Sequence, residues 1–164
     1  SDAVKAQALI AIPRAYGIPC TDEPKTYSHW YTNGTTKMRP DVEYHTSRHT
    51  AIDLSIVYPD EESEPGTRAK QKANEKVRSH SEAVTRVGHL FVPFIMETSG
   101  YLHKDAVGLI SGLANQLHPW IRPFFRADMK RALAVSLMRQ KVWAIRAAIQ
   151  KHRNSLTEHV NNSQ

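Results

Sequence analysis

Residues 39–58, RPDVEYHTSRHTAIDLSIVY, carry the clearest indication of how this chain folds. The stretch contains two β-rich runs, 39–45 and 50–58, and the short polar segment between them favours a tight turn. If residues 46–48 form this turn, it joins antiparallel strands in which facing residues have numbers that sum to 94. This register places Asp41 opposite Asp53.

The flanking segments extend this pair of strands into an α+β sheet. Upstream, the β-rich run 26–32 (TYSHWYT), followed by the turn residues Asn33-Gly34, predicts the first of three consecutive strands. Downstream, the apolar run 89–98 predicts a buried strand, and the helix before it implies a crossover connection. Helices are predicted over 3–16, 67–80, 103–117 and 124–153. The predicted order is therefore α-β-β-β-α-β with C-terminal helices.

The pair Asp41 and Asp53 predicts a divalent-metal site. Directly opposed residues have Cβ atoms about 4.5–5.5 Å apart, and two carboxylates at that distance repel each other unless a cation lies between them. Asp53 lies between Ile52 and Leu54 in an apolar strand, where an aspartate needs a partner or a function. Oxygen ligands suit Mg²⁺ or Mn²⁺. The alternative is a register slipped by one residue, or an aspartate that only ends its strand.

Lys76 is the third candidate for the site. Ala69, Ala73, Lys76 and His80 fall on one face of the predicted helix, and the small alanines allow that face to lie close to the sheet. A lysine there could stabilise charge on a scissile phosphate or orient the attacking water. The alternative is a solvated lysine on a basic helix surface.

Composition and charge narrow the class of protein. The 164 residues are 40% apolar and 23% charged, which is typical of one soluble domain, and no apolar run reaches the ~20 residues that span a bilayer. A single cysteine, Cys20, excludes an internal disulfide and favours an intracellular, reducing compartment. The net charge is +6, and residues 101–164 hold ten Lys/Arg against three Asp/Glu. This excess suits a polyanion such as nucleic acid, although a solvated basic helix face is the alternative.

Two weaker patterns have competing interpretations. The spacing His45-x-x-x-His49 could indicate zinc, but no cysteine pair accompanies it, and histidines exposed in a turn near phosphate are the favoured interpretation. Apolar residues in the last predicted helix step by 3 and 4 and form one stripe, through which a homodimer is possible. These stripe residues are Val135, Met138, Val142, Ile145 and Ile149.

Three spaced elements resemble a known family. Arg39-Pro40-Asp41, then Asp53 in an apolar strand, then a helix with Ala73-x-x-Lys76-x-x-x-His80 look like the restriction-endonuclease-like domain of site-specific non-long-terminal-repeat retrotransposon reverse transcriptases. The flanking segments 15–24 and 93–100 are similar to the tails of related retroelements. The resemblance covers roughly residues 10–112.

The resemblance implies a role for each matching residue. Asp41 and Asp53 would bind Mg²⁺ or Mn²⁺, and Lys76 would be the catalytic lysine. Glu23 would be an accessory acid. His80 stands where the family commonly has an aromatic residue, and Ser55 stands where typical PD-(D/E)-x-K nucleases have lysine, so both are accessory candidates. The basic residues expected to contact nucleic acid are Arg39, Arg48, Lys72, Arg139 and Arg146.

The resemblance also implies a function and a location. The expected protein is a metal-dependent endonuclease with a restriction-endonuclease-like core (1–118) and a basic helical extension of the same domain (119–164). It would nick target DNA in the nucleus to prime reverse transcription, with RNA as a further partner in a reverse-transcriptase complex and no membrane partner. The alternative is a catalytically inactive nuclease fold that serves as a nucleic-acid-binding or assembly module.

Overall fold

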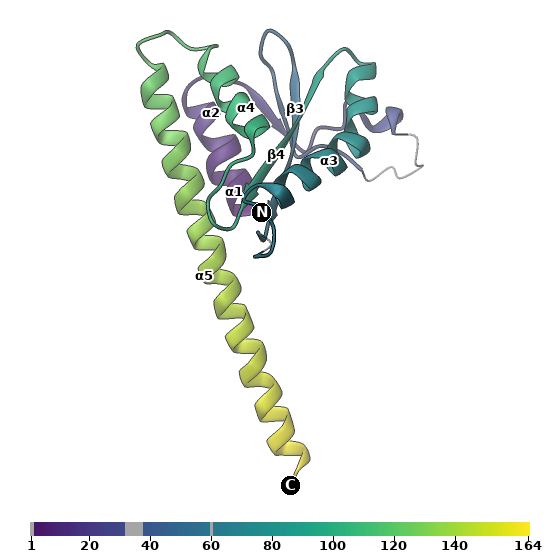
Figure 1. Cartoon of the computed structure of the whole chain (residues 1–164), viewed down its shortest axis with the longest axis vertical. Coiled ribbons are helices and arrows are strands. Elements are labelled where there is room, and N and C mark those ends of the chain that lie inside the picture. Colours follow the sequence, from purple (N-terminus) through teal and green to yellow (C-terminus); the bar gives the residue numbers. More distant parts are fainter. Residues whose placement is uncertain (1, 32–37, 60) are drawn as a thin grey trace.

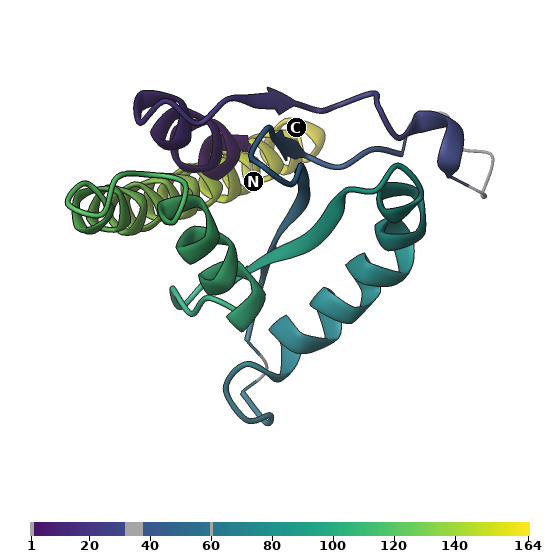
Figure 2. The ribbon, with the colours of Figure 1, turned by 90° about the horizontal axis from the view of Figure 1, so that it is seen from above.

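A computed structural model describes residues 2–31, 38–59 and 61–164, which form a four-stranded mixed sheet with helices on both faces (Figures 1 and 2). The predicted turn Asn33-Gly34 lies outside the described residues. The elements in chain order are α1 (Asp2–Val4), η1 (Lys5–Ile10), α2 (Ala11–Ala15), β1 (Cys20–Asp22), η2 (Ser28–Trp30), β2 (Val42–Tyr44), β3 (Thr50–Val57), α3 (Thr67–Arg86), β4 (Leu90–Glu97), α4 (Lys104–Ala114) and α5 (Arg122–Asn162). The α+β prediction is confirmed at this level.

The sheet has the order β1-β2-β3-β4, and the predicted register between β2 and β3 is confirmed. Both β1–β2 and β2–β3 are antiparallel, and Val42 faces Ile52 while Tyr44 faces Thr50. Asp41 lies directly before the paired residues of β2, and its backbone N–H donates to the Ile52 carbonyl at 2.9 Å. The short connection between the strands therefore sets the register, as expected for a tight hairpin.

The crossover is also confirmed. β4 pairs parallel with β3, and α3 connects them along one face of the sheet. α3 continues to Arg86, six residues beyond the predicted end near His80. The added turn carries Ala83 and Val84, whose buried side chains pack against Tyr27, Ala51 and Phe91.

The prediction of a strand over 26–32 is wrong for the residues that the structure describes. Residues Ser28–Trp30 form a 3₁₀ turn, and the first strand is Cys20–Asp22 instead. The aromatic residues Tyr27 and Tyr31, which favoured a strand, pack instead near the C-terminal half of α3. Tyr27 is fully buried there, and the Tyr31 hydroxyl contacts His80. Tertiary packing thus overrides the local β propensity of this segment.

The largest apolar core lies on the face of the sheet opposite α3. β2, β3 and β4 alternate side chains between the two faces, so that Tyr44, Ile52 and Phe94 point into this core. The N-terminal helical segment, α4 and the first half of α5 cover it, as Figure 2 shows. The face toward α3 has only small apolar clusters and leaves room for polar residues.

The second half of α5 projects away from the rest of the molecule (Figure 1). Its buried residues all precede Met138, and every residue from Val142 to Gln164 is exposed. The predicted apolar stripe is solvent-exposed, with Met138 at 61% and Ile145 at 59%. The homodimer stays a prediction. Among the described helices, none has an apolar stretch long enough to cross a membrane.

Candidate active site

The polar residues of β2 and β3 gather on the α3 face of the sheet. Val42, Tyr44, Ile52 and Leu54 point into the large core, so the residues between them must point the other way. Asp41 and Asp53 are therefore brought to the same face from neighbouring strands.

Asp41 and Asp53 form a contacting pair of carboxyl groups with opposite environments. Burial and the neighbouring Asp53 carboxylate raise the pKa of Asp41 to about 6, and a hydrogen bond between the two carboxyl groups adds to this shift. The backbone N–H of Leu54 donates to Asp41 Oδ2 at 2.7 Å and holds that side chain in place. Burial acts to raise the pKa of Asp53 as well, but hydrogen bonds from His80 and Lys76 outweigh it and lower that pKa. Asp53 is thus the more acidic member of the pair.

α3 brings Lys76 and His80 onto Asp53, as the helix pattern predicts. Lys76 Nζ lies 2.6 Å from Asp53 Oδ2, and His80 Nε2 lies 3.2 Å from the same oxygen. Ala69 and Ala73 are buried between α3 and the sheet, which permits this close approach. The alternative of a solvated Lys76 is wrong, because its side chain is 22% exposed and ion-paired.

His80 is held in place on its other side. The Tyr31 hydroxyl lies 2.7 Å from His80 Nδ1, and the His80 ring stacks on Phe91 with centroids 5.2 Å apart. Burial and the charge of Asp53 raise the pKa of Tyr31, so its hydroxyl stays protonated. His80 therefore connects Asp53 to a rigid aromatic cluster.

The other accessory candidates lie around this centre without touching Asp53. Glu23 has the left-handed backbone angle φ of 46°, and its N–H donates to the Asp41 carbonyl at 2.8 Å. Its carboxylate accepts from Arg39 at 3.0 Å, so Arg39 is placed next to Asp41 by an ion pair. Ser55 is half-buried on β3, two residues after Asp53 and on the same strand face.

The five predicted nucleic-acid contacts do not form one surface. Arg39 and Lys72 lie near the acidic pair, Lys72 being one helical turn before Lys76 and ion-paired with Glu75. Arg48 is exposed in the β2–β3 turn. Arg139 and Arg146 belong to α5, across the sheet from α3. The C-terminal basic excess is therefore separate from the acidic pair.

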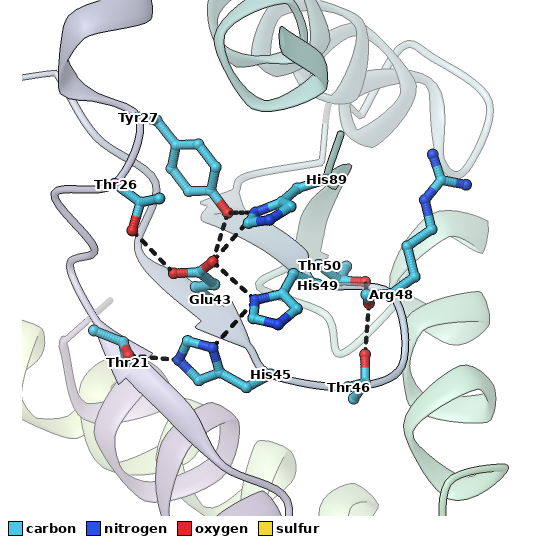
Figure 3. A network of polar contacts seen from close by, with 10 residues as sticks. All are labelled: Thr21, Thr26, Tyr27, Glu43, His45, Thr46, Arg48, His49, Thr50 and His89. Carbon is cyan, nitrogen blue, oxygen red and sulfur yellow. Dashed lines mark hydrogen bonds and ion pairs between the residues drawn. The ribbon is translucent and has the colours of Figure 1, made fainter. Parts of the chain in front are cut away.

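A second polar cluster lies on the same sheet face (Figure 3). Its centre is Glu43, whose side chain is only 3% exposed. Glu43 Oε1 accepts from the Tyr27 hydroxyl at 3.0 Å and lies 3.4 Å from His49 Nδ1 and 3.3 Å from His89 Nδ1. His45 Nδ1 lies 3.2 Å from His49 Nδ1. The histidines of the hairpin are thus not freely solvated turn residues.

Sequence reasoning missed Tyr31, Glu43 and His89. Glu43 could have been found, because Asp41, Glu43 and His45 alternate along β2 and must share one strand face. His89 could not have been found in this way, because it becomes the neighbour of His49 only through the register in which β4 pairs with β3.

In comparisons with known proteins, no protein-family model matched the chain, and no curated protein sequence was significantly similar to it.

Proposed function

We propose that this protein is a divalent-metal-dependent DNA endonuclease with a restriction-endonuclease-like core. One observation carries the proposal: two carboxylates from neighbouring strands and a lysine from the crossover helix converge on one another. The α-β-β-β-α-β order and the likeness of Arg39-Pro40-Asp41, Asp53 and Lys76 to the retroelement nucleases support it.

The donor set fits a hard divalent cation. Asp41 and Asp53 offer oxygen ligands only, and burial together with the charge of Asp53 raises the pKa of Asp41, a destabilisation of its ionised form that a cation would relieve. When bound between these carboxylates, Mg²⁺ or Mn²⁺ would polarise a phosphodiester oxygen and activate water for attack on phosphorus. Glu23 pairs with Arg39 and its N–H donates to the Asp41 carbonyl, so the Arg39 guanidinium would contact a phosphate of the strand bound at this site.

The remaining steps, which are orienting the carboxylates and stabilising the reacting phosphate, fall to side chains and backbone groups of the protein. Leu54 N–H orients Asp41, and the His80 contact orients Asp53. The Lys76 ammonium stabilises the negative charge that develops on the pentacovalent phosphorus centre, and it holds the water in line with the leaving oxygen. Attack by water forms one P–O bond while the P–O bond to the leaving sugar breaks, and overall the proton that the attacking water releases is balanced by the proton that the leaving sugar oxygen takes from solvent.

Nicking of supercoiled plasmid in Mg²⁺ or Mn²⁺ tests the function. We expect cleavage by the wild type, and a loss of at least about a hundredfold in Asp53→Asn, which weakens metal binding, and in Lys76→Ala, which removes positive charge at the reacting phosphate. Lys70→Ala, an exposed change on the same helix, is the matched control and should nick as the wild type does. Circular dichroism verifies that each variant is folded. Equal nicking by wild type and Asp53→Asn would refute this assignment.

A catalytically inactive nuclease fold is the second candidate, and one observation favours it. Asp53 Oδ2 already has two partners, Lys76 and His80, that satisfy it without a metal. Under this alternative the chain binds DNA or assembles with a partner, and no metal-dependent nicking occurs although salt-sensitive DNA binding persists.

The proposed biological setting follows from the resemblance. The nick in nuclear DNA would provide a primer for reverse transcription, and RNA would be a further partner in the same complex.

A further inference from the structure

We propose that Glu43, His45 and His49 form a second metal site, specific for Zn²⁺, which closes the β2–β3 hairpin beside the acidic pair. This inference does not depend on the proposed nuclease function.

The spacing of the donor atoms fits a tetrahedral ion. With bonds of about 2.0–2.1 Å from Zn²⁺ to nitrogen and oxygen, the donors of a tetrahedral site lie about 3.3–3.4 Å apart. His45 Nδ1 and His49 Nδ1 are 3.2 Å apart, and His49 Nδ1 and Glu43 Oε1 are 3.4 Å apart. All three donors lie within 4.8 Å of one another.

The surroundings orient these ligands as in known metal sites. Metal-bound histidines commonly donate their second ring N–H to an oxygen, which leaves the other nitrogen free to bind. His45 Nε2 lies 2.7 Å from Thr21 Oγ1 and so can present the lone pair of Nδ1 to the metal. Glu43 accepts from Tyr27 and from Thr26, which fixes its carboxylate plane. Figure 3 shows these partners arranged around Glu43.

The charge balance also calls for a cation. A carboxylate as buried as Glu43 needs a positive partner. In the part of the chain that the structure describes, no lysine or arginine is ion-paired with Glu43, and only His49 and His89 lie within ion-pair distance. A divalent ion would supply that charge while the histidines stay neutral.

The donor sets of the two sites select different metals. Two imidazole nitrogens and one carboxylate suit Zn²⁺, whereas the carboxylate oxygens of Asp41 and Asp53 suit Mg²⁺. Three protein ligands leave one coordination position for water, and solvent reaches the cluster at His49, whose side chain is 41% exposed. Because His45 and His49 flank the hairpin turn, the ion would link both of its strands.

Zinc titration in excess Mg²⁺, with a chromophoric chelator as competitor, tests the site. We expect one Zn²⁺ per chain in the wild type, and an affinity at least about tenfold lower in His45→Ala and His49→Ala, which lose a direct ligand. Thr21→Val, which removes only the contact to His45 Nε2, should weaken binding by roughly tenfold to a hundredfold. His152→Ala, an exposed histidine of α5, is the matched control and should leave binding unchanged.

Two further variants separate this site from the nuclease site. Asp41→Asn and Asp53→Asn should keep full zinc binding even though they lose nicking activity. Failure of the wild type to bind zinc, or equal affinity in His49→Ala, would overturn the second site and leave the nuclease proposal standing. Zinc binding without any nicking would support the second site alone. Zinc thermally stabilises only the variants that bind it, which provides an independent readout.

Discussion

Asp41 and Asp53 are the same residue type on facing strands, and their neighbours give them opposite properties. Asp53 has the ammonium of Lys76 and the imidazole of His80 on one oxygen, so its pKa is low. Among the described residues none is ion-paired with Asp41, and burial and the charge of Asp53 raise its pKa against the weaker opposing effect of Lys5. The environment, and not the residue type, therefore determines which acid carries a proton.

The pKa of Asp41 predicts a pH dependence of stability. Because the pKa is 3.8 in the unfolded chain and about 6 in the folded one, the folded state retains a proton on Asp41 that the unfolded state releases between these values. The contribution of Asp41 to the free energy of unfolding is thus present below pH 4 and is lost as the pH rises through 6.

Urea unfolding of wild type and Asp41→Asn at pH 4 and pH 7 measures this contribution. We expect the wild type to lose stability relative to Asp41→Asn as the pH rises, since the variant has no proton to lose. Glu64→Gln, a change at an exposed carboxylate in the loop before α3, should track the wild type at both values. A pH response of Asp41→Asn identical to that of the wild type would show that Asp41 titrates normally.

At the scale of elements, the close packing of α3 on the sheet positions Lys76 and His80. Ala69 and Ala73 are at most 3% exposed and contact the apolar side chains of Val57 and Ile95. Larger residues at these positions would lift the helix off β3 and move Lys76 away from Asp53. The alanines therefore support the site although they carry no chemistry.

Ala73→Leu tests this role. Overpacking a tight helix-sheet contact costs about 1–3 kcal/mol in the free energy of unfolding, and metal-dependent nicking should fall with the displacement of Lys76. Asn74→Leu places the same side chain at an exposed position of α3 and should change stability by less than about 0.5 kcal/mol. Urea unfolding and plasmid nicking provide the two readouts. Unchanged values in Ala73→Leu would mean that the interface is not tightly packed.

At the scale of the whole molecule, α5 has two parts with different roles. Its first half contributes Phe125, Met129, Leu133 and Leu137 to the large core. Its second half makes no buried contact after Lys141 in the described chain and presents apolar and basic residues to solvent. Since most helical stability in proteins comes from tertiary packing, which this half of α5 lacks in the described chain, it adds little to the stability of the folded body.

A chain that ends at Lys141 tests this division. We expect its free energy of unfolding, measured by urea titration with far-ultraviolet circular dichroism, to lie within about 0.5 kcal/mol of that of the full chain. A chain that ends at Met129 loses Leu133 and Leu137 and should be several kcal/mol less stable. A large loss in the first truncation would show that residues 142–164 contact the body. Sedimentation at several concentrations tests the possible homodimer separately.

The sequence by itself determined the local features of this protein. Turn residues and alternating side chains placed β2 and β3 in the right register, because pleated strands point successive residues to opposite faces. The 3.6-residue period of a helix placed four residues on one face of α3, because residues three or four apart point in the same direction. These residues are Ala69, Ala73, Lys76 and His80. Both features depend only on contacts between near neighbours in the chain.

Only the tertiary structure decided the features that depend on distant segments. Tyr27 and Tyr31 belong to a non-strand segment because burial against α3 outweighs their β propensity. His89 reaches Glu43 because β4 pairs parallel with β3, and α5 is half core and half exposed because the body ends where the helix continues. These features depend on which elements pack against one another. The residue pattern within a single element does not predict that packing.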